Sequence, residues 1–230
     1  MNYNRKILLY SGGMDSWLID KLYQPDLKLF IDIGTASSRA ERKRCPADVQ
    51  VVEFQSLGQF ERREDFILPL RNLYLLMIAA NYGNEICLGA TKTDVTCDKT
   101  EEFRDKASDI LTYLYSKQKW TDARTIRVNL DYKGYTKADL LREYIARGGD
   151  WRKAWEETFT CFTPTPEGKE CRGCRACFLK LAAFIENGIA LPKNLVAPYL
   201  PYIEAKFMDR DYRDRLYPKN FYARILNDYQ

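Results

Sequence analysis

A short run near the start of the chain combines two glycines, two serines and one aspartate. It consists of Ser11, Gly12, Gly13, Met14, Asp15 and Ser16, between an apolar stretch and a helical pattern. The glycines permit a sharp turn that presents N–H groups, the serines add hydroxyl donors, and the positive end of the following helix points at the same place. The run is not a Walker A loop. An ordinary strand-to-helix turn is the simpler alternative, but the six residue types together favour an oxyanion site.

Four of the seven cysteines stand close together: Cys161, Cys171, Cys174 and Cys177. Thiolates with nine, two and two residues between them can surround one tetrahedral Zn²⁺ ion. The C-x2-C-x2-C spacing also occurs in iron–sulfur sites, which are the main chemical alternative. Because the number of cysteines is odd, a complete disulfide framework is not expected, and a reduced compartment fits better.

The composition excludes several classes of site. The chain contains no histidine, so Ser-His-Asp triads, histidine proton relays and histidine metal ligands are absent. With 36 basic and 32 acidic residues the formal net charge is +4, which does not favour nucleic acid binding. Neither a membrane-spanning run nor a signal-peptide core is found, so we expect a cytoplasmic protein with no membrane partner.

Apolar, β-leaning stretches alternate with helical patterns through the first half of the chain. The expected strands are residues 7–10, 27–33, 49–54, 86–88 and 125–130, and the expected helices are residues 16–23, 36–44, 70–82 and 101–116. This alternation predicts an α/β fold, a parallel twisted sheet with helices on both faces, in which ligands bind outside the carboxyl ends of the strands.

The second half of the chain has mostly helical patterns. Helical patterns cover residues 136–147, 150–158 and about 178–186, and the Pro- and Tyr-rich tail from Pro192 is expected to be a partly ordered arm. We therefore expect an α/β domain over residues 1–134 and a small helical zinc-binding region over residues 135–230.

The expected helix of residues 70–82 is apolar except at its start, where Arg71 and Asn72 stand. Its interior is predicted to be buried core. A guanidinium and an amide at a helix N-terminus can face a phosphate or the edge of a nucleobase, although capping or pairing with a surface acid fits equally well. In the later stretch of residues 89–103, the acids Glu101 and Glu102 could equally be N-terminal charges of the next helix.

The motifs together resemble a known family. Residues 11–16 match the S-G-G-x-D-S signature of the PP-loop, or N-type ATP pyrophosphatase, enzymes. P-x-R-N at residues 69–72, T-K-A-D-L at residues 136–140 and the four cysteines are similar, in order, to motifs of 7-cyano-7-deazaguanine synthases. The resemblance covers about residues 6–186 and implies an adenine nucleotide alpha hydrolase-like fold, with ATP, Mg²⁺ and Zn²⁺ as cofactors. It implies these ATP-binding residues: Ser11, Gly12, Gly13, Met14, Asp15, Ser16, Arg71 and Asn72.

The same resemblance assigns the acceptor site. In the family a glycine is followed by T-D, a turn, P-D-C-R, an acid and Phe, and the matching residues here are Gly89, Thr93, Asp94, Asp98, Glu102 and Phe103. Asp15 would hold Mg²⁺ or orient the phosphates, while Asp94 or Asp98 would orient the base edge or accept a proton from ammonium. The pattern departs in two places. Lys99 stands where the family has its cysteine, and Y-G-Q-x-H is not reproduced at residues 33–42, although Gly34 and Glu41 fit.

The implied activity is that of an AMP- or ADP-forming C–N ligase. It would convert 7-carboxy-7-deazaguanine and ammonia to 7-cyano-7-deazaguanine through adenylated carboxylate and amide intermediates, or stop at the amide. Another PP-loop enzyme is the alternative, such as a tRNA-modifying sulfurtransferase with Cys97 as nucleophile, which would bind tRNA with strong salt dependence. A non-catalytic protein with a decayed loop is disfavoured by the intact residues 11–16. The expected partners are the small-molecule substrates, and a homodimer is left open.

Overall fold

A five-stranded parallel sheet forms the centre of the α/β part of the chain. The computed structural model describes residues 3–65, 67–120, 122–161, 163–209 and 217–229. Within these residues the strands are β1 (Lys6–Leu9), β2 (Leu27–Asp32), β3 (Val49–Glu53), β4 (Glu85–Leu88) and β5 (Arg127–Asn129). All neighbouring pairs are parallel, in the order β3-β2-β1-β4-β5. The sheet confirms the expected fold class.

Side chains alternate along each strand, so successive residues pack on opposite faces of the sheet, and helices cover both faces. Leu8 packs in one core cluster with residues of α1 (Met14–Tyr23) and of the C-terminal helices. Ile7 and Leu9 pack in a second cluster with residues of α3 (Arg71–Ala79) and α4 (Glu101–Leu114). The two-sided burial explains why the strands read as short, continuously apolar runs.

The strand order places a topological switch point at the centre of the sheet. The chain builds outward from β1 through β2 and β3, and then returns to place β4 on the other side of β1. The loops after β1 and β4 therefore leave the same edge in opposite directions, which opens a crevice where α/β sheets bind ligands. Residues 11–16 follow β1 at this switch point.

The helix α3 is less buried than its composition predicts. Asn72, Leu76 and Ala79 are buried, but Met77 on the opposite side is 44% exposed. The prediction of a core interior therefore holds for one side of the helix only, because a helix that covers one face of a sheet buries only one of its own sides. The helix also begins after Leu70, whose φ of 60° lies in the left-handed region.

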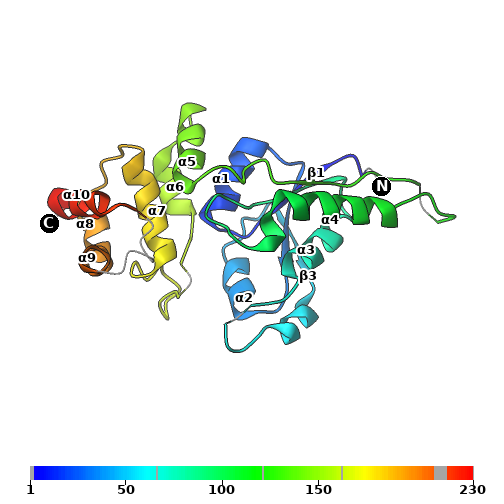
Figure 1. Cartoon of the computed structure of the whole chain (residues 1–230), viewed down its shortest axis with the longest axis horizontal. Coiled ribbons are helices and arrows are strands. Elements are labelled where there is room, and N and C mark those ends of the chain that lie inside the picture. Colours follow the sequence, from blue (N-terminus) through cyan, green and yellow to red (C-terminus); the bar gives the residue numbers. More distant parts are fainter. Residues whose placement is uncertain (1–2, 66, 121, 162, 210–216, 230) are drawn as a thin grey trace.

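The C-terminal part is a packed group of helices (Figure 1). The longer ones are α5 (Lys137–Ala146), α6 (Trp151–Glu157), α7 (Arg175–Glu186), α9 (Leu200–Met208) and α10 (Lys219–Tyr229). Shorter turns fill the chain between them, namely α8 (Lys193–Val196) and η3 (Ala197–Tyr199), while α2 (Ala36–Arg42), η1 (Gln55–Phe60) and η2 (Cys97–Lys99) lie in the α/β part.

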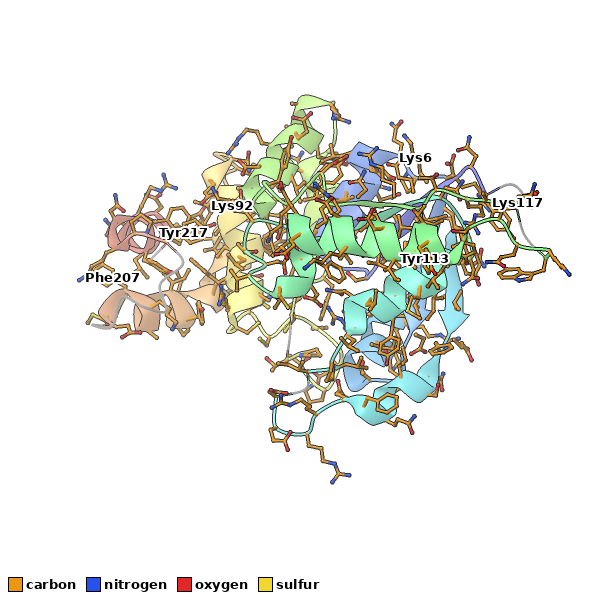
Figure 2. The ribbon with its side chains drawn as sticks, turned by 45° about the vertical axis from the view of Figure 1, so that its right-hand side comes forward. Lys6, Lys92, Tyr113, Lys117, Phe207 and Tyr217 are labelled. Atoms are coloured by element: carbon orange, nitrogen blue, oxygen red, sulfur yellow. The ribbon has the colours of Figure 1, made fainter. Side chains whose placement is uncertain are left out.

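The described part of the tail after Pro192, residues 193–209 and 217–229, packs against the rest of the chain, while residues 210–216 of the predicted partly ordered arm lie outside the described residues. Tyr199, Ile203 and Tyr222 are at most 1% exposed, and the ring of Tyr222 stacks on Phe178 with centroids 5.1 Å apart. In Figure 2 the side chains of Phe207 and Tyr217 lie at this end of the molecule, opposite Lys117. Tyrosine supplies a large apolar surface, so a tyrosine-rich tail can form core.

One core cluster joins residues of the sheet, such as Leu8, to Tyr222 near the C-terminus. The division at residues 134 and 135 thus stays a prediction, since the two parts share packed side chains. Among the described residues no helix has both the length and the apolar character needed to cross a membrane.

Candidate nucleotide site and metal centre

The turn of residues 11–16, here called the phosphate loop, links β1 to α1. The hydroxyls of Ser11 and Ser16 lie 3.2 Å apart, and the Ser16 hydroxyl donates to the Gly13 carbonyl oxygen at 3.1 Å. Gly12 has a φ of +74°, which glycine adopts without strain. The helix begins at Met14, two residues earlier than predicted, so its first unpaired N–H groups belong to the loop itself. The loop is thus preformed around a helix N-terminus, as an anion site requires.

Asp15 lies in the first turn of α1 with its two carboxylate oxygens in different situations. Oδ2 accepts a hydrogen bond from the Lys137 Nζ at 2.5 Å, across 122 positions of sequence. Oδ1 is buried and has no hydrogen-bond partner among the described residues. A buried oxygen without a partner is costly, and a bound cation is one group that satisfies it. The donor set therefore fits Mg²⁺, a hard cation that prefers carboxylate oxygens.

Glu41 lies against the phosphate loop from the side of α2. A Cβ atom placed on Gly12 would lie 3.6 Å from the Glu41 carbonyl oxygen and 3.8 Å from the Arg44 Cβ. Burial raises the pKa of the Glu41 carboxyl to about 7, against the opposing effect of Arg71 and Arg44. The charge of Arg71 thus acts on the Glu41 carboxyl, while an ATP-binding role for Arg71 stays a prediction. An acid that titrates near neutrality is a common feature of functional sites.

The loop after β4, residues 89–100 and here called the β4 loop, holds its charges in internal pairs. Asp94 Oδ2 accepts from the Thr91 backbone N–H at 2.7 Å, and Oδ1 accepts from the Lys99 ammonium. Although burial opposes it, these contacts lower the pKa of Asp94. The Lys133 ammonium donates to the carbonyl oxygens of Thr91 and Asp94. Asp94 is therefore an ionised, fully engaged carboxylate that shapes the loop.

Two predicted site residues meet at the entrance of α3. The Asn72 side chain, 2% exposed, donates to Asp98 Oδ2 at 2.8 Å. This partly buried bond joins the β4 loop to α3, so the amide of Asn72 already has a partner. Asp98 is only partly buried.

The remaining predicted acceptor-site residues have local partners. Glu102 is exposed and pairs with Lys106 at 2.6 Å, and Phe103 packs against the core under α4. The Thr93 hydroxyl lies 3.2 Å from that of Thr91. A Cβ atom on Gly89 would meet the Ile19 Cδ1 at 3.6 Å, an ordinary contact. Substrate contact by these four residues stays a prediction.

The loops that leave β1, β4 and β5 are tied together by single contacts. Lys137, which pairs with Asp15, follows the loop after β5. In that loop the Tyr135 backbone carbonyl oxygen accepts from the Lys92 backbone N–H at 2.8 Å. The segment after β5 therefore contacts both the phosphate loop and the β4 loop.

Near residues 33–42, where Y-G-Q-x-H is not reproduced, polar side chains form hydrogen bonds with one another. Asp32 is 1% exposed and accepts from the Ser38 hydroxyl at 2.9 Å and from Arg42 at 3.0 Å. These groups therefore pair with each other at the end of β2.

The four cysteines converge as their spacing predicts. All four sulfur atoms lie within 4.8 Å of one another, where Cys161 precedes the turn and Cys177 belongs to α7. In a tetrahedral zinc site the bonds are about 2.3 Å, which separates the sulfurs by about 3.8 Å. The cluster therefore fits a metal ion. Cys45, Cys87 and Cys97 lie outside it and are also free thiols.

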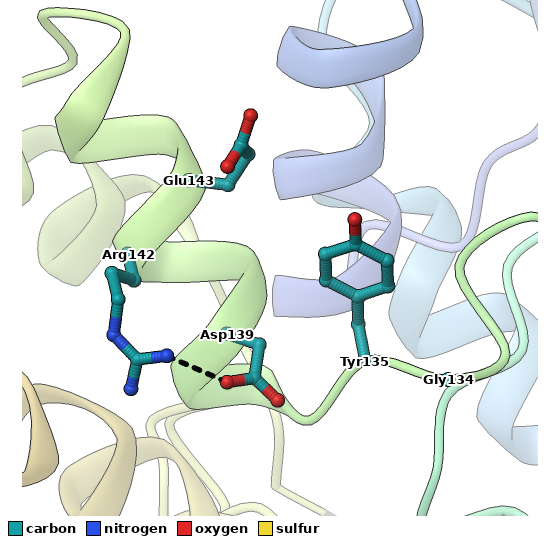
Figure 3. Close-up of a pocket in the computed structure, with 5 residues that line it drawn as sticks. All are labelled: Gly134, Tyr135, Asp139, Arg142 and Glu143. Carbon is teal, nitrogen blue, oxygen red and sulfur yellow. Dashed lines mark hydrogen bonds and ion pairs between the residues drawn. The ribbon is translucent and has the colours of Figure 1, made fainter.

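A hollow of about 260 Å³ lies between α5 and the β5 loop (Figure 3). Tyr135 and Glu143 face it, while Asp139 and Arg142 pair with each other at 2.7 Å. Its lining contains no residue of the phosphate loop, so nothing connects it to nucleotide binding.

Three further residues at the phosphate loop were given no role from the sequence: Glu41, Arg44 and Phe159. Phe159 forms an isolated parallel β-bridge with Gly13, and the Arg44 guanidinium lies 3.4 Å from its ring centroid. Only Glu41 carried a signal in the sequence, through its fit to the family pattern, because the other contacts join residues far apart in the chain.

Comparison with known proteins agrees with this geometry. The model of the family described as "Queuosine biosynthesis protein QueC" matches residues 26–188, which include the four cysteines and begin after the phosphate loop. The chain is 24% identical to the 7-cyano-7-deazaguanine synthase of Hahella chejuensis (strain KCTC 2396), over 82% of this chain and 92% of that protein. It is 25% identical to the synthase of Geobacter metallireducens (strain ATCC 53774 / DSM 7210 / GS-15), over 83% of this chain and 92% of that protein. With the match covering most of its length, the chain belongs to the QueC family of queuosine biosynthesis proteins.

Proposed function

We propose that this chain makes 7-cyano-7-deazaguanine from 7-carboxy-7-deazaguanine, ammonia and ATP. The relatives are named for that product. The observation that carries the proposal is the phosphate loop at the switch point of the sheet, where Asp15 Oδ1 is buried without a partner. Its place in the fold is that of a nucleotide site.

The chemistry requires two activations. A carboxylate oxygen is a poor leaving group, so it attacks the α-phosphorus of ATP and forms an acyl adenylate with release of pyrophosphate. Ammonia then displaces AMP and loses a proton, which gives the amide. The amide oxygen is adenylated by a second ATP, and loss of AMP with the remaining N–H protons leaves the nitrile.

The residues of the chain serve these steps by position and charge. Ser11, Ser16 and the first N–H groups of α1 stabilise the negative charge that develops on the departing pyrophosphate. Asp15 would hold Mg²⁺, which when bound neutralises phosphate charge. Of the two aspartates in the β4 loop, Asp98 is the better candidate to accept a proton from ammonium, since Asp94 has partners on both oxygens.

The four cysteines would hold Zn²⁺ in a structural role, since four thiolates leave no open coordination position. The small-molecule substrates suffice as partners for this reaction. A homodimer stays a prediction that the reaction does not require.

The test is a product analysis. The protein is incubated with ATP, Mg²⁺, ammonium and 7-carboxy-7-deazaguanine, and the products are followed by mass spectrometry. We expect two AMP for each nitrile formed, with the amide as an intermediate. Accumulation of amide with one AMP would place the end point one step earlier. AMP formation with a different carboxylate but none with this one would reject the substrate and keep the class.

A further inference from the structure

One extended segment joins the two sites described above. Residues 157–161, here called the connecting segment, run from the end of α6 to the first cysteine of the cluster. Within five residues this segment contacts both the phosphate loop and the surroundings of the four thiols. A rigid link of this kind can couple two binding events.

On one side the connecting segment contacts the nucleotide site. Phe159 pairs with Gly13 in the isolated β-bridge, and the Phe159 carbonyl oxygen would lie 3.6 Å from a Cβ atom placed on Gly13. The Glu157 carboxylate accepts from the Trp17 ring N–H at 3.2 Å, which holds the segment against α1. Movement of the segment would therefore move the backbone from which the anion site is built.

On the other side the segment is fixed to the metal centre. The Cys161 sulfur accepts from the Cys171 backbone N–H at 3.2 Å. Glu170 accepts from the Thr160 N–H at 2.8 Å, and it also pairs with the Lys180 ammonium at 3.3 Å. Lys180, 2% exposed, donates to the Thr158 carbonyl oxygen at 2.6 Å. These bonds hold the connecting segment against Glu170 and Cys171 and against α7.

Arg44 contacts the connecting segment and the stretch between Cys161 and Cys171. Its guanidinium stacks on the Phe159 ring and donates to the Gly168 carbonyl oxygen at 3.0 Å, within the stretch between Cys161 and Cys171. One side chain thus contacts the flank of the phosphate loop, the connecting segment and the turn that carries the thiols.

We infer that metal binding at the four cysteines and nucleotide binding at the phosphate loop strengthen each other, with Phe159 and Arg44 as the positioning residues that join the sites. This inference rests on the proposed nucleotide role of the phosphate loop. A bound metal ion would tie Cys161 to the other three thiols, and through Cys161 it would hold the Gly13–Phe159 bridge. Coupling between binding equilibria is reciprocal, so bound nucleotide must also raise the affinity for the metal. Because the nucleotide would hold the connecting segment in place, we expect the higher affinity to show as slower loss of the metal.

The test measures metal release. Protein loaded with Zn²⁺ is mixed with a chromophoric chelator, with and without saturating Mg-ATP, and release is followed by absorbance. Binding of Mg-ATP to each protein is measured separately by calorimetry. In the unmodified chain we expect Mg-ATP to slow release by about fivefold or more.

Two variants break the link and one serves as control. In Phe159→Leu and Arg44→Gln we expect Mg-ATP, once bound, to slow release by less than about twofold. Arg224→Gln removes a similar arginine–ring contact, with Phe221 in α10, and should behave as the unmodified chain.

Each outcome decides something different. Mg-ATP that binds the unmodified chain without slowing release overturns the inference and leaves the proposed function intact. Equal slowing in Phe159→Leu and Arg44→Gln overturns the role of these two side chains. Failure of Mg-ATP to bind any of the proteins overturns the proposed function itself. If a variant does not fold, the comparison in the unmodified chain still decides the coupling.

Discussion

The phosphate loop and the β4 loop leave neighbouring strands at the same edge of the sheet, yet their polar groups are used differently. In the phosphate loop, Asp15 keeps one buried oxygen without a partner. In the β4 loop, Asp94 has partners on both oxygens and Asp98 is held by Asn72. The first loop is thus prepared for a charged ligand, whereas the second is a stabilised wall of the crevice. The predictions below test this contrast, from the largest effect to the smallest.

The largest effect is expected for Asp15→Asn, which keeps the shape of the side chain and removes its charge. AMP formation should fall by about 10²- to 10³-fold, because electrostatic stabilisation of the departing pyrophosphate is lost. The metal content of the four-cysteine cluster should not change. The control is Asp20→Asn on the same helix, which pairs with Lys21 and should keep its activity. Similar losses in both variants would contradict a special role for Asp15.

Glu41→Gln tests whether the Glu41 carboxyl beside the phosphate loop has a raised pKa. The pKa of Glu41 is about 7 in the folded protein and 4.5 in the unfolded chain, so the folded state binds the proton more strongly. The free energy of unfolding therefore falls as the pH rises from 4.5 to 7, by about 1 to 3 kcal/mol, and Glu41→Gln does not share this loss.

Urea unfolding at pH 5 and pH 8 measures this difference. Relative to the unmodified chain, Glu41→Gln should gain stability at pH 8. Glu102→Gln is the matched control on the exposed surface, and it should not gain. A difference between Glu41→Gln and the unmodified chain that is the same at both pH values would refute the raised pKa.

Asn72→Ala tests how the β4 loop is fixed. Loss of the partly buried bond to Asp98 should lower the free energy of unfolding by about 1 to 2 kcal/mol. The control, Asn81→Ala, removes an exposed side chain just after the same helix and should cost less. Thermal unfolding of both variants decides the point. An equal cost would mean that the Asn72–Asp98 contact contributes nothing special.

The smallest effect is expected for Lys99→Met. Its partner Asp94 is already held by the Thr91 backbone N–H, and the pair is partly exposed, so the free energy of unfolding should change by less than about 1 kcal/mol. A Michaelis constant for 7-carboxy-7-deazaguanine that rises tenfold would instead show that Lys99 binds the acceptor carboxylate.

Local patterns in the sequence predict the elements and both motifs. The sheet, the phosphate loop and the four thiols all follow from runs of a few residues whose partners stand nearby. In the tail after Pro192, proline and charge suggest disorder, whereas the i, i+3 spacing of Tyr222 and Ile225 gives α10 a buried face and Ile203 of α9 is buried as well.

The contacts that complete the site could not be predicted in this way. Lys137 meets Asp15 across 122 positions, and Phe159 meets Gly13 only because the C-terminal helices pack beside α1. Such pairs depend on the whole fold, since no local spacing encodes them. Family resemblance supplied Lys137 as part of a motif, but not its partner.

The most direct test of the central claim is isotope exchange between pyrophosphate and ATP. Labelled pyrophosphate is added with ATP, Mg²⁺ and 7-carboxy-7-deazaguanine, in the absence of ammonia. If the phosphate loop grips pyrophosphate while the acid is adenylated, label enters ATP only when the acid is present, and Asp15→Asn abolishes the exchange. Absence of exchange together with formation of ADP and phosphate would contradict the account.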